Sequence, residues 1–194
     1  MEKAIQRYIN SYTKICPNLT QEELDFIKKR VTVTELQNKE FYLKSGDIQK
    51  EMGFVFQGLL RSFYVDSNGN EITIAFIQED SYAADYSVFI TQKPSKFYIQ
   101  CLEPCIMVNL PYISIQDAYL EFKNFEKYGR LIAESILVNR QNRIESFLFE
   151  NAKERYLNFA NQNPNLLNRI SLTHLSSYLG VERQSLSRIR NKLV

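Results

Sequence analysis

The spacing of apolar residues divides the chain into zones, and the first zone, residues 1–30, has a helical pattern. Within it, Thr20 is followed three residues later by Glu23, which is the signature of a capping box and places the start of a second helix there. We therefore predict two helices that flank the next zone. The apolar positions at helical spacing in the first of them are Ile5, Tyr8, Ile9 and Tyr12.

From Val31 to about Leu110 the pattern changes to short runs of β-branched and aromatic residues, such as FVFQG and KFYIQCLEPCIMVNL. Asn68-Gly69 between two such runs is a strong hairpin signal, and glycines 46 and 58 mark further breaks. Many short strands at such intervals predict a β-sandwich or jelly roll. The run after the hairpin is expected to form a half-buried strand in which Ile72, Ile74 and Phe76 alternate with Glu71, Thr73 and Ala75.

From about Ile115 to Gln162 the pattern is helical again, and Gly129 is its one strong breaker. The apolar stripe is longer than a small domain needs to cover itself. It can pack on the β domain of its own chain or against a second copy, and its length and width favour a dimerisation helix. The stripe consists of Phe122, Phe125, Ile132, Ile136, Ile144, Phe147 and Leu148.

A turn-rich break, NQNPNLLN, precedes the C-terminal stretch ISLTHLSSYLGVERQSLSRIRNKL. Ser171 is expected to cap a first helix, and Gly180 is expected to end it. Two short helices that meet at a glycine predict a helix-turn-helix, whose second helix enters the DNA major groove. The inward-facing residues are predicted to be Leu175, Tyr178 and Leu179 in the first helix and Leu186, Ile189 and Leu193 in the second.

The second of these helices carries side chains that can read bases. Arg183 and Gln184 fall in its first turn, and Arg188 lies one turn further along the same side. An arginine fork matches guanine and a glutamine amide matches adenine, whereas Arg190 and Lys192 can meet phosphates. A helical hairpin with a merely solvated basic face is the alternative interpretation.

The charge distribution favours the DNA-binding interpretation. The whole chain has a formal charge of only +2, but residues 169–194 hold five Lys or Arg residues against Glu182 alone. The rest of the chain is slightly acidic. The positive charge is thus concentrated where the helix-turn-helix is predicted.

Other features argue against catalysis and membrane insertion. His174 is the sole histidine, too few for a clustered metal site, and no G-x-S-x-G, P-loop or Rossmann motif is present. We therefore expect no catalytic residues, no metal and no cofactor. No secretion signal or stretch of about 20 apolar residues is found, so a cytoplasmic protein without a membrane partner is expected. The three cysteines, Cys16, Cys101 and Cys105, are expected to be free thiols with a structural role.

Three segments carry a resemblance to a known family: KSGD at 44–47, the run FVFQGLLRSFYVDSNGNEITIAFIQEDS at 54–81, and ISLTHLSSYLGVERQSLSRIR at 170–190. In this order they resemble the Crp/Fnr superfamily of bacterial transcription regulators, the cyclic-AMP receptor protein type. The resemblance implies an α+β fold with a jelly-roll sensor domain and flanking helices (1–114), a dimerisation helix (115–150) and a helix-turn-helix domain (151–194). It also implies a homodimer on an inverted DNA repeat, a small-molecule effector, and RNA polymerase as a further partner that the family allows.

The family reads DNA through an arginine, an acidic residue or glutamine, and a later arginine, which correspond here to Arg183, Gln184 and Arg188. Ser185 stands where a phosphate-contacting hydroxyl usually lies. The family also continues into a β-hairpin wing, whereas this chain ends at Val194, so no wing contacts are expected. The full set of expected DNA-contacting residues is Arg183, Gln184, Ser185, Ser187, Arg188, Arg190 and Lys192.

The cyclic-nucleotide cassette of the family is altered in this chain. Where cyclic-nucleotide binders carry Gly-Glu for the ribose, this sequence has Ala84-Asp85, and where they carry Arg-Ser or Arg-Thr for the phosphate, it has Ser95-Lys96. These four residues are the expected effector pocket, and cyclic AMP is not expected to be the effector. A small-molecule or cyclic-nucleotide binding protein that does not bind DNA remains the alternative, and a jelly-roll enzyme would need a metal site.

Overall fold

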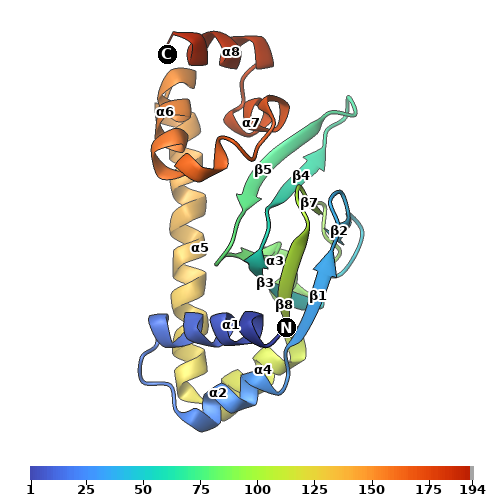
Figure 1. Cartoon of the computed structure of the whole chain (residues 1–194), viewed down its shortest axis with the longest axis vertical. Coiled ribbons are helices and arrows are strands. Elements are labelled where there is room, and N and C mark those ends of the chain that lie inside the picture. The colour runs from blue at the N-terminus through green and yellow to red at the C-terminus, as the bar shows by residue number, and fades with distance from the viewer. Residues whose placement is uncertain (193–194) are drawn as a thin grey trace. The chain divides into compact units, whose positions relative to one another are not determined.

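The computed structural model describes residues 1–192, so Leu193, predicted to face inward, lies outside the described residues. The chain forms two compact units: unit 1 comprises residues 1–62 and 76–134, and unit 2 comprises residues 63–75 and the described residues from 135 onward. Figure 1 shows the helices and strands in chain order. The helices are α1 (Glu2–Ile15), α2 (Gln21–Lys28), α3 (Tyr86–Thr91), α4 (Tyr112–Glu121), α5 (Lys123–Phe149), α6 (Ala152–Gln162), α7 (Leu172–Leu179) and α8 (Arg183–Asn191), with a 3₁₀ turn at Pro164–Leu166. The strands are β1 (Thr32–Leu36), β2 (Phe41–Leu43), β3 (Glu51–Gln57), β4 (Leu60–Val65), β5 (Glu71–Ile77), β6 (Tyr82–Ala83), β7 (Tyr98–Cys101) and β8 (Cys105–Pro111).

The strands form two four-stranded sheets, which confirms the predicted jelly-roll-like β domain. One sheet has the order β1-β8-β3-β6 and the other β2-β7-β4-β5. β8 lies between β1 and β3 and pairs antiparallel with both. Val108 of β8 lies opposite Val33 of β1 on one side and opposite Phe54 of β3 on the other. Side chains alternate between the two faces of each strand, so each sheet presents one face to the interior of the roll.

Side chains fill the interior of the roll. Tyr42 of β2 reaches across to β8, where its hydroxyl donates to Asn109 Oδ1 at 3.0 Å. A Cβ atom on Gly53 would lie 2.5 Å from the Tyr42 hydroxyl, so a larger residue there would force the Tyr42 ring to shift. The apolar residues buried in this cluster are Leu43, Val55, Leu60, Ile77, Ala83, Ile99, Cys101, Cys105 and Met107.

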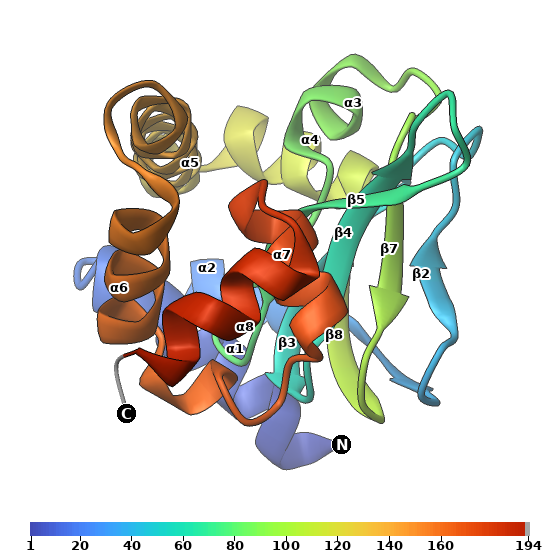
Figure 2. The same cartoon turned by 90° about the horizontal axis from the view of Figure 1, so that it is seen from above.

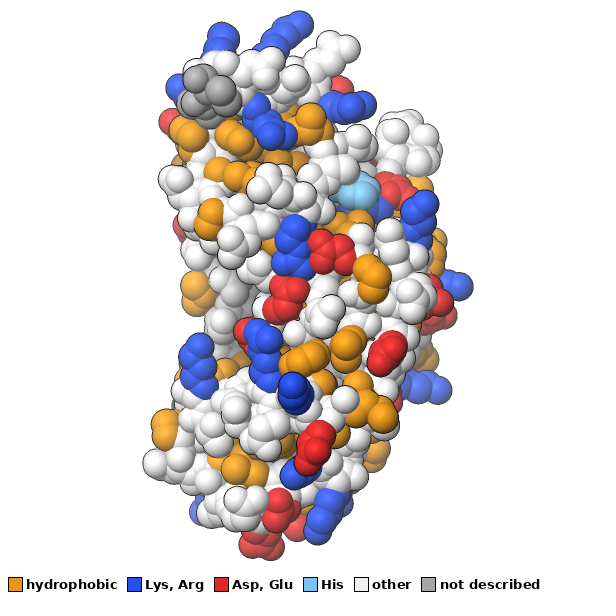
Figure 3. Space-filling model, viewed as in Figure 1, with side chains coloured by type: hydrophobic (Ala, Val, Ile, Leu, Met, Phe, Trp, Pro, Cys, Tyr) orange, Lys and Arg blue, Asp and Glu red, His pale blue; other side chains and the backbone are white. Residues whose placement is uncertain are grey.

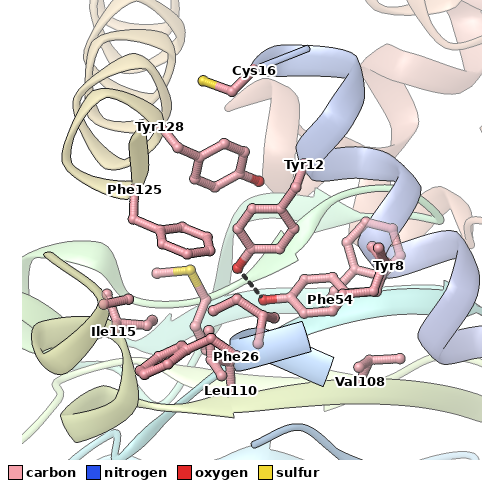
Figure 4. Packing of buried hydrophobic residues seen from close by; sticks show 14 of the residues in the cluster. Tyr8, Tyr12, Cys16, Phe26, Phe54, Val108, Leu110, Ile115, Phe125 and Tyr128 are labelled. Carbon is pink, nitrogen blue, oxygen red and sulfur yellow. Dashed lines mark hydrogen bonds between the residues drawn. The ribbon is translucent and has the colours of Figure 1, made fainter. Parts of the chain in front are cut away.

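A second buried cluster joins the outer face of β3 and β8 to the helices of unit 1 (Figure 4). Tyr8 and Tyr12 of α1 share a hydrogen bond of 2.7 Å between their hydroxyls, and Tyr12 stacks on Tyr128 of α5 with ring centroids 4.2 Å apart. The predicted capping box is present, since Thr20 accepts from the Glu23 N–H at 3.3 Å and Glu23 accepts from the Thr20 N–H at 2.7 Å. The helices of residues 1–30 were therefore predicted correctly: Tyr8, Ile9 and Tyr12 are core residues, and the half-buried Ile5 packs against them.

The predicted alternation in β5 is wrong in detail. Thr73 and Ile77 are the buried residues of this strand, whereas Ile72, Ile74 and Phe76 are only half-buried. Thr73 is 2% exposed because its strand lies against α7 within unit 2, where its N–H donates to Ser177 Oγ at 2.9 Å. The alternation of apolar and polar residues in the sequence could not show that α7 covers the face of β5 on which Thr73 lies.

The long helical zone is also interrupted, although no proline or glycine marks the breaks. Phe122 adopts an extended conformation between α4 and α5, with its ring packed 5.3 Å from that of Phe26. Asn151 caps α6 and so ends the continuity with α5.

Within the described residues, no helix is both long and apolar enough to cross a membrane.

Only part of the apolar stripe on α5 is covered by its own chain. Phe125 is buried in unit 1, and Ile132 and Ile136 are half-buried. Further along the helix, apolar side chains stand in solvent in the single chain. They are Leu137 (69% exposed), Val138 (56%), Ile144 (54%), Phe147 (47%), Leu148 (69%) and Phe149 (79%).

Candidate nucleic-acid interface and effector pocket

Two short helices of unit 2, α7 and α8, lie next to each other (Figure 2), at the place where the sequence predicts a helix-turn-helix. Ser171 caps α7 as expected, because its hydroxyl accepts from the backbone N–H of His174 at 3.1 Å. Gly180 ends α7 in the left-handed conformation with φ of +65°. A side chain at this position would also crowd Phe147, since a Cβ atom there would lie 2.7 Å from a carbon of its ring.

The buried side of α8 is held by Leu186, which is fully buried, and by the half-buried Ile189. Successive residues of an α-helix are turned by about 100°, so the residues opposite these two face away from the chain. Gln184 and Arg188 are exposed residues of this face, and Arg183, in the first turn, is exposed at its edge.

The remaining predicted DNA contacts surround this exposed face. Ser187 lies on the same face but is half-buried, Ser185 and Lys192 are exposed on one flank, and the half-buried Arg190 lies on the other. Lys and Arg side chains are prominent at the end of the molecule that carries α8 (Figure 3). The helix therefore offers the amide of Gln184 and the guanidinium of Arg188 on its exposed face, with Arg183 and further hydroxyl and cationic groups beside them.

The end of α7 is held by two arginines that were not singled out in the sequence. Arg143 of α5 donates through Nη2 to the carbonyl oxygen of Tyr178, and Arg155 of α6 donates through Nε to that of Leu179 at 2.9 Å. Burial lowers the pKa of Arg143 from its usual value. Both arginines occur in stretches without a recognisable motif, so no sequence signal marked them.

Two of the four predicted effector residues meet in unit 1. Ser95 Oγ donates to Asp85 Oδ2 at 2.9 Å, and these residues are 3% and 7% exposed. The hydroxyl of Ser87 also donates to Asp85, at 3.3 Å. Ala84 instead packs with the apolar cluster, and Lys96 is exposed. In this cassette the buried Asp85 carboxylate is thus already bound by a neutral hydroxyl of the same chain, that of Ser95.

A residue missed in the sequence, Gln49, completes this network. Its side-chain oxygen accepts from the Asp85 N–H at 2.9 Å, while its Nε2 donates to the carbonyl oxygens of Ala83 at 2.9 Å and Glu51 at 3.0 Å. The KSGD segment holds the other side, because the Gly46 N–H donates to the carbonyl oxygen of Ser95 at 2.7 Å. A lone glutamine before a strand carries no motif, so only the fold identifies its role.

A small cavity of about 30 Å³ lies beside the tyrosines of unit 1. Tyr119 borders it, and burial raises the pKa of this phenol to about 12. Burial also raises the pKa values of Tyr12 and Tyr128 well above their usual value. The cavity has room for about one or two water molecules, too little for a nucleotide.

Comparison with known proteins agrees with this architecture. A family model described as a cyclic nucleotide-binding domain matches residues 33–121. FixK2 from Bradyrhizobium japonicum has a similar structure, with a TM-score of 0.73, 14% sequence identity and coverage of 84% of each chain. A protein from Eubacterium rectale assigned to the Crp/Fnr family of transcriptional regulators gives a TM-score of 0.72 at 13% identity, covering 92% of this chain and 85% of that one.

The Catabolite Activator Protein of Thermus thermophilus is also similar, with a TM-score of 0.57 at 17% identity and coverage of 91% of this chain and 84% of that one. At these identities the likeness establishes the fold. No curated protein matches the chain.

Proposed function

Because the chain has the fold of the Crp/Fnr superfamily and its residues 33–121 match the cyclic nucleotide-binding domain family, we propose that it is a homodimeric, sequence-specific DNA-binding transcription regulator. The resemblance that the sequence indicated is confirmed in fold and in domain family. The similar proteins named in the comparison are regulators rather than enzymes. A cytoplasmic location, double-stranded DNA as the partner and the absence of catalysis are parts of this proposal.

The observation that carries the proposal is the exposed face of α8. Gln184 and Arg188 lie on that face, opposite the fully buried Leu186, and the exposed Arg183 lies at its edge in the first turn. Long polar side chains that project from one side of a helix-turn-helix are the groups that contact base edges in the major groove. Guanidinium forks and a glutamine amide make bidentate hydrogen bonds to guanine and adenine respectively.

Dimerisation is supported by the exposed half of the α5 stripe. Leu137, Ile144 and Leu148 fall on one side of the helix, and each is more than half exposed in the single chain. Apolar residues at such spacing are commonly buried against the same helix of a second copy. A two-fold axis along α5 would present two α8 helices to an inverted repeat.

The effector is proposed to be something other than cyclic AMP. A cyclic phosphate that replaced Ser95 as the partner of Asp85 would bring its negative charge beside a buried carboxylate. The arginine that holds this phosphate in cyclic-nucleotide binders is replaced here by a serine hydroxyl, which cannot supply a charge-assisted bidentate contact. The protein is therefore proposed to respond to another small molecule or to act without one.

Selection of bound sequences from random double-stranded DNA tests the proposal. The expected result is an inverted repeat whose half-sites are separated by about one helical turn, 10–10.5 base pairs, or a multiple of it. Binding to that repeat should weaken steeply as salt concentration rises, because phosphate contacts release counterions. Failure to enrich any sequence, together with no retention on heparin, would contradict DNA binding and favour the alternative of a small-molecule binding protein.

A further inference from the structure

The arginines that hold the end of α7 do more than complete a helix terminus. Arg143 comes from α5 and Arg155 from α6, and the two bind consecutive carbonyl oxygens, those of Tyr178 and Leu179. These are the last two residues of α7, directly before the Gly180 turn into α8. The hydrogen bonds from α5 and α6 therefore fix the C-terminal end of α7, and with it the direction in which the chain continues into α8.

Aromatic contacts lock the geometry of Arg143. Its guanidinium carbon lies 3.8 Å from the ring centroid of Tyr178 and 4.2 Å from that of Phe147. Arg155 approaches the same Phe147 ring at 5.1 Å. A planar guanidinium between aromatic rings has few alternative orientations, unlike a lysine ammonium.

Arg155 in addition joins the ends of two helices. Its Nη1 donates to the carbonyl oxygen of Glu150 at 2.5 Å, directly after α5, while its Nε binds Leu179. Asn151, the next residue, caps α6 with a complete capping box that includes Glu154. The bend from α5 to α6 and the end of α7 are thus fixed by one side chain. Cations are also favoured at these positions by the negative end of each helix dipole.

We infer that Arg143 and Arg155 form an arginine latch that sets the angle between α5 and the recognition helix α8, and thereby the half-site spacing that the dimer accepts. Neither residue belongs to the exposed face of α8, so both are positioning residues rather than base-reading ones. The inference rests on the proposed function, because spacing has meaning only for a dimer on DNA. Each added base pair turns one half-site by about 35° relative to the other, so a rigid angle makes spacing selective.

The test uses the full-length protein and the inverted repeat that the wild type selects from random DNA. Dissociation constants are measured on that repeat and on the same half-sites with the spacer lengthened by about half a helical turn, roughly five base pairs. The wild type is expected to bind the selected spacing roughly 100-fold more tightly than the lengthened one. In the double variant Arg143→Gln with Arg155→Gln, this ratio is expected to fall to about tenfold or less, because hydrogen bonds to two charged groups are lost. Base preference within each half-site should not change.

Matched controls are available on the same two helices. Arg140 of α5 and Lys153 of α6 are exposed, so Arg140→Gln and Lys153→Gln remove the same charge without touching α7. Their spacing ratios should equal that of the wild type. Light scattering checks that all variants stay dimeric, which separates loss of the latch from loss of the second subunit.

The outcomes separate the latch from the proposed function. A double variant that keeps the wild-type spacing ratio overturns the latch, as does a wild type that binds all spacings equally. If the double glutamine variant does not fold, Arg143→Lys is tested instead, because a lysine keeps the charge but lacks the planar guanidinium. A spacing ratio below that of the wild type supports the latch, and a wild-type ratio overturns it. A wild type that binds no inverted repeat refutes the proposed function, and the latch with it.

Discussion

The hydroxyl of Ser95 donates a hydrogen bond of 2.9 Å to the carboxylate of Asp85, and both side chains are buried. The chain thereby supplies, from its own residues, the polar partner that a ligand would otherwise bring to this cassette. Gln49 extends the network to the backbone of Asp85. A buried polar group that is already hydrogen-bonded gains little from a ligand that has to displace its partner.

Cyclic AMP and cyclic GMP should therefore not bind measurably. The phosphate would have to be desolvated next to Asp85 without an arginine to neutralise it. Calorimetric titration of the full-length protein with each nucleotide is the check. A dissociation constant near micromolar, about 8 kcal/mol of binding free energy, would contradict the prediction.

Ser95→Ala should destabilise the protein, because it leaves the buried Asp85 carboxylate with one donor fewer. The free energy of unfolding is expected to fall by about 1–3 kcal/mol in urea titrations. Ser87→Ala is the matched control, since this serine is exposed and its bond to Asp85 is longer, 3.3 Å. If the two variants lose equal stability, the Ser95 bond has no special importance.

Leu137→Glu combined with Ile144→Glu should convert the proposed dimer to monomers, because it would place charges in the apolar interface proposed for α5. These positions are better suited than Ile132 and Ile136, whose half-burial in the single chain would mix interface effects with folding effects. Light scattering at micromolar concentration is the measurement. Leu120→Glu, at a position of α4 that is 89% exposed, is the control and should leave the mass unchanged. A monomeric wild type would disprove the dimer.

Arg183→Ala and Arg188→Ala should each weaken binding to the selected repeat by about 1–3 kcal/mol and relax the preference for one base pair. Lys192→Ala should weaken binding to all sequences alike, as expected for a phosphate contact. Titrations against the selected repeat and against random DNA distinguish the two effects. If Arg183→Ala loses equal binding free energy on both DNAs, Arg183 does not contact a base.

Gly180→Ala should destabilise unit 2 by about 1–3 kcal/mol, because an alanine there has a strained φ and meets the Phe147 ring. Gly69 also has a positive φ, +82°, but a Cβ atom added to it would have no neighbouring atom within 4 Å. Gly69→Ala thus isolates the backbone strain and should have the smaller effect in thermal unfolding. An equal effect would show that the contact with Phe147 is unimportant.

Much of this protein was predictable because local patterns report local structure. Apolar residues at helical spacing predicted the N-terminal helices, Thr20 and Glu23 predicted the capping box, and Ser171 and Gly180 predicted the limits of α7. Each depends on hydrogen bonds between residues close in sequence. The order of motifs then sufficed to indicate the fold, which the structural comparison supports, and residues 33–121 match the model of a cyclic nucleotide-binding domain.

Other features depended on which distant segments meet, and only the tertiary structure decided them. Thr73 is buried because α7 covers its strand, against the period-two pattern of β5. Gln49 joins Asp85 across 36 residues, and Arg143 reaches Tyr178 across 35. A side chain that caps a carbonyl group needs no particular neighbours in sequence, so nothing in the pattern marks it. The exposed face of α8 could be predicted from the sequence, but the contacts of Arg143 and Arg155 with the end of α7 could not.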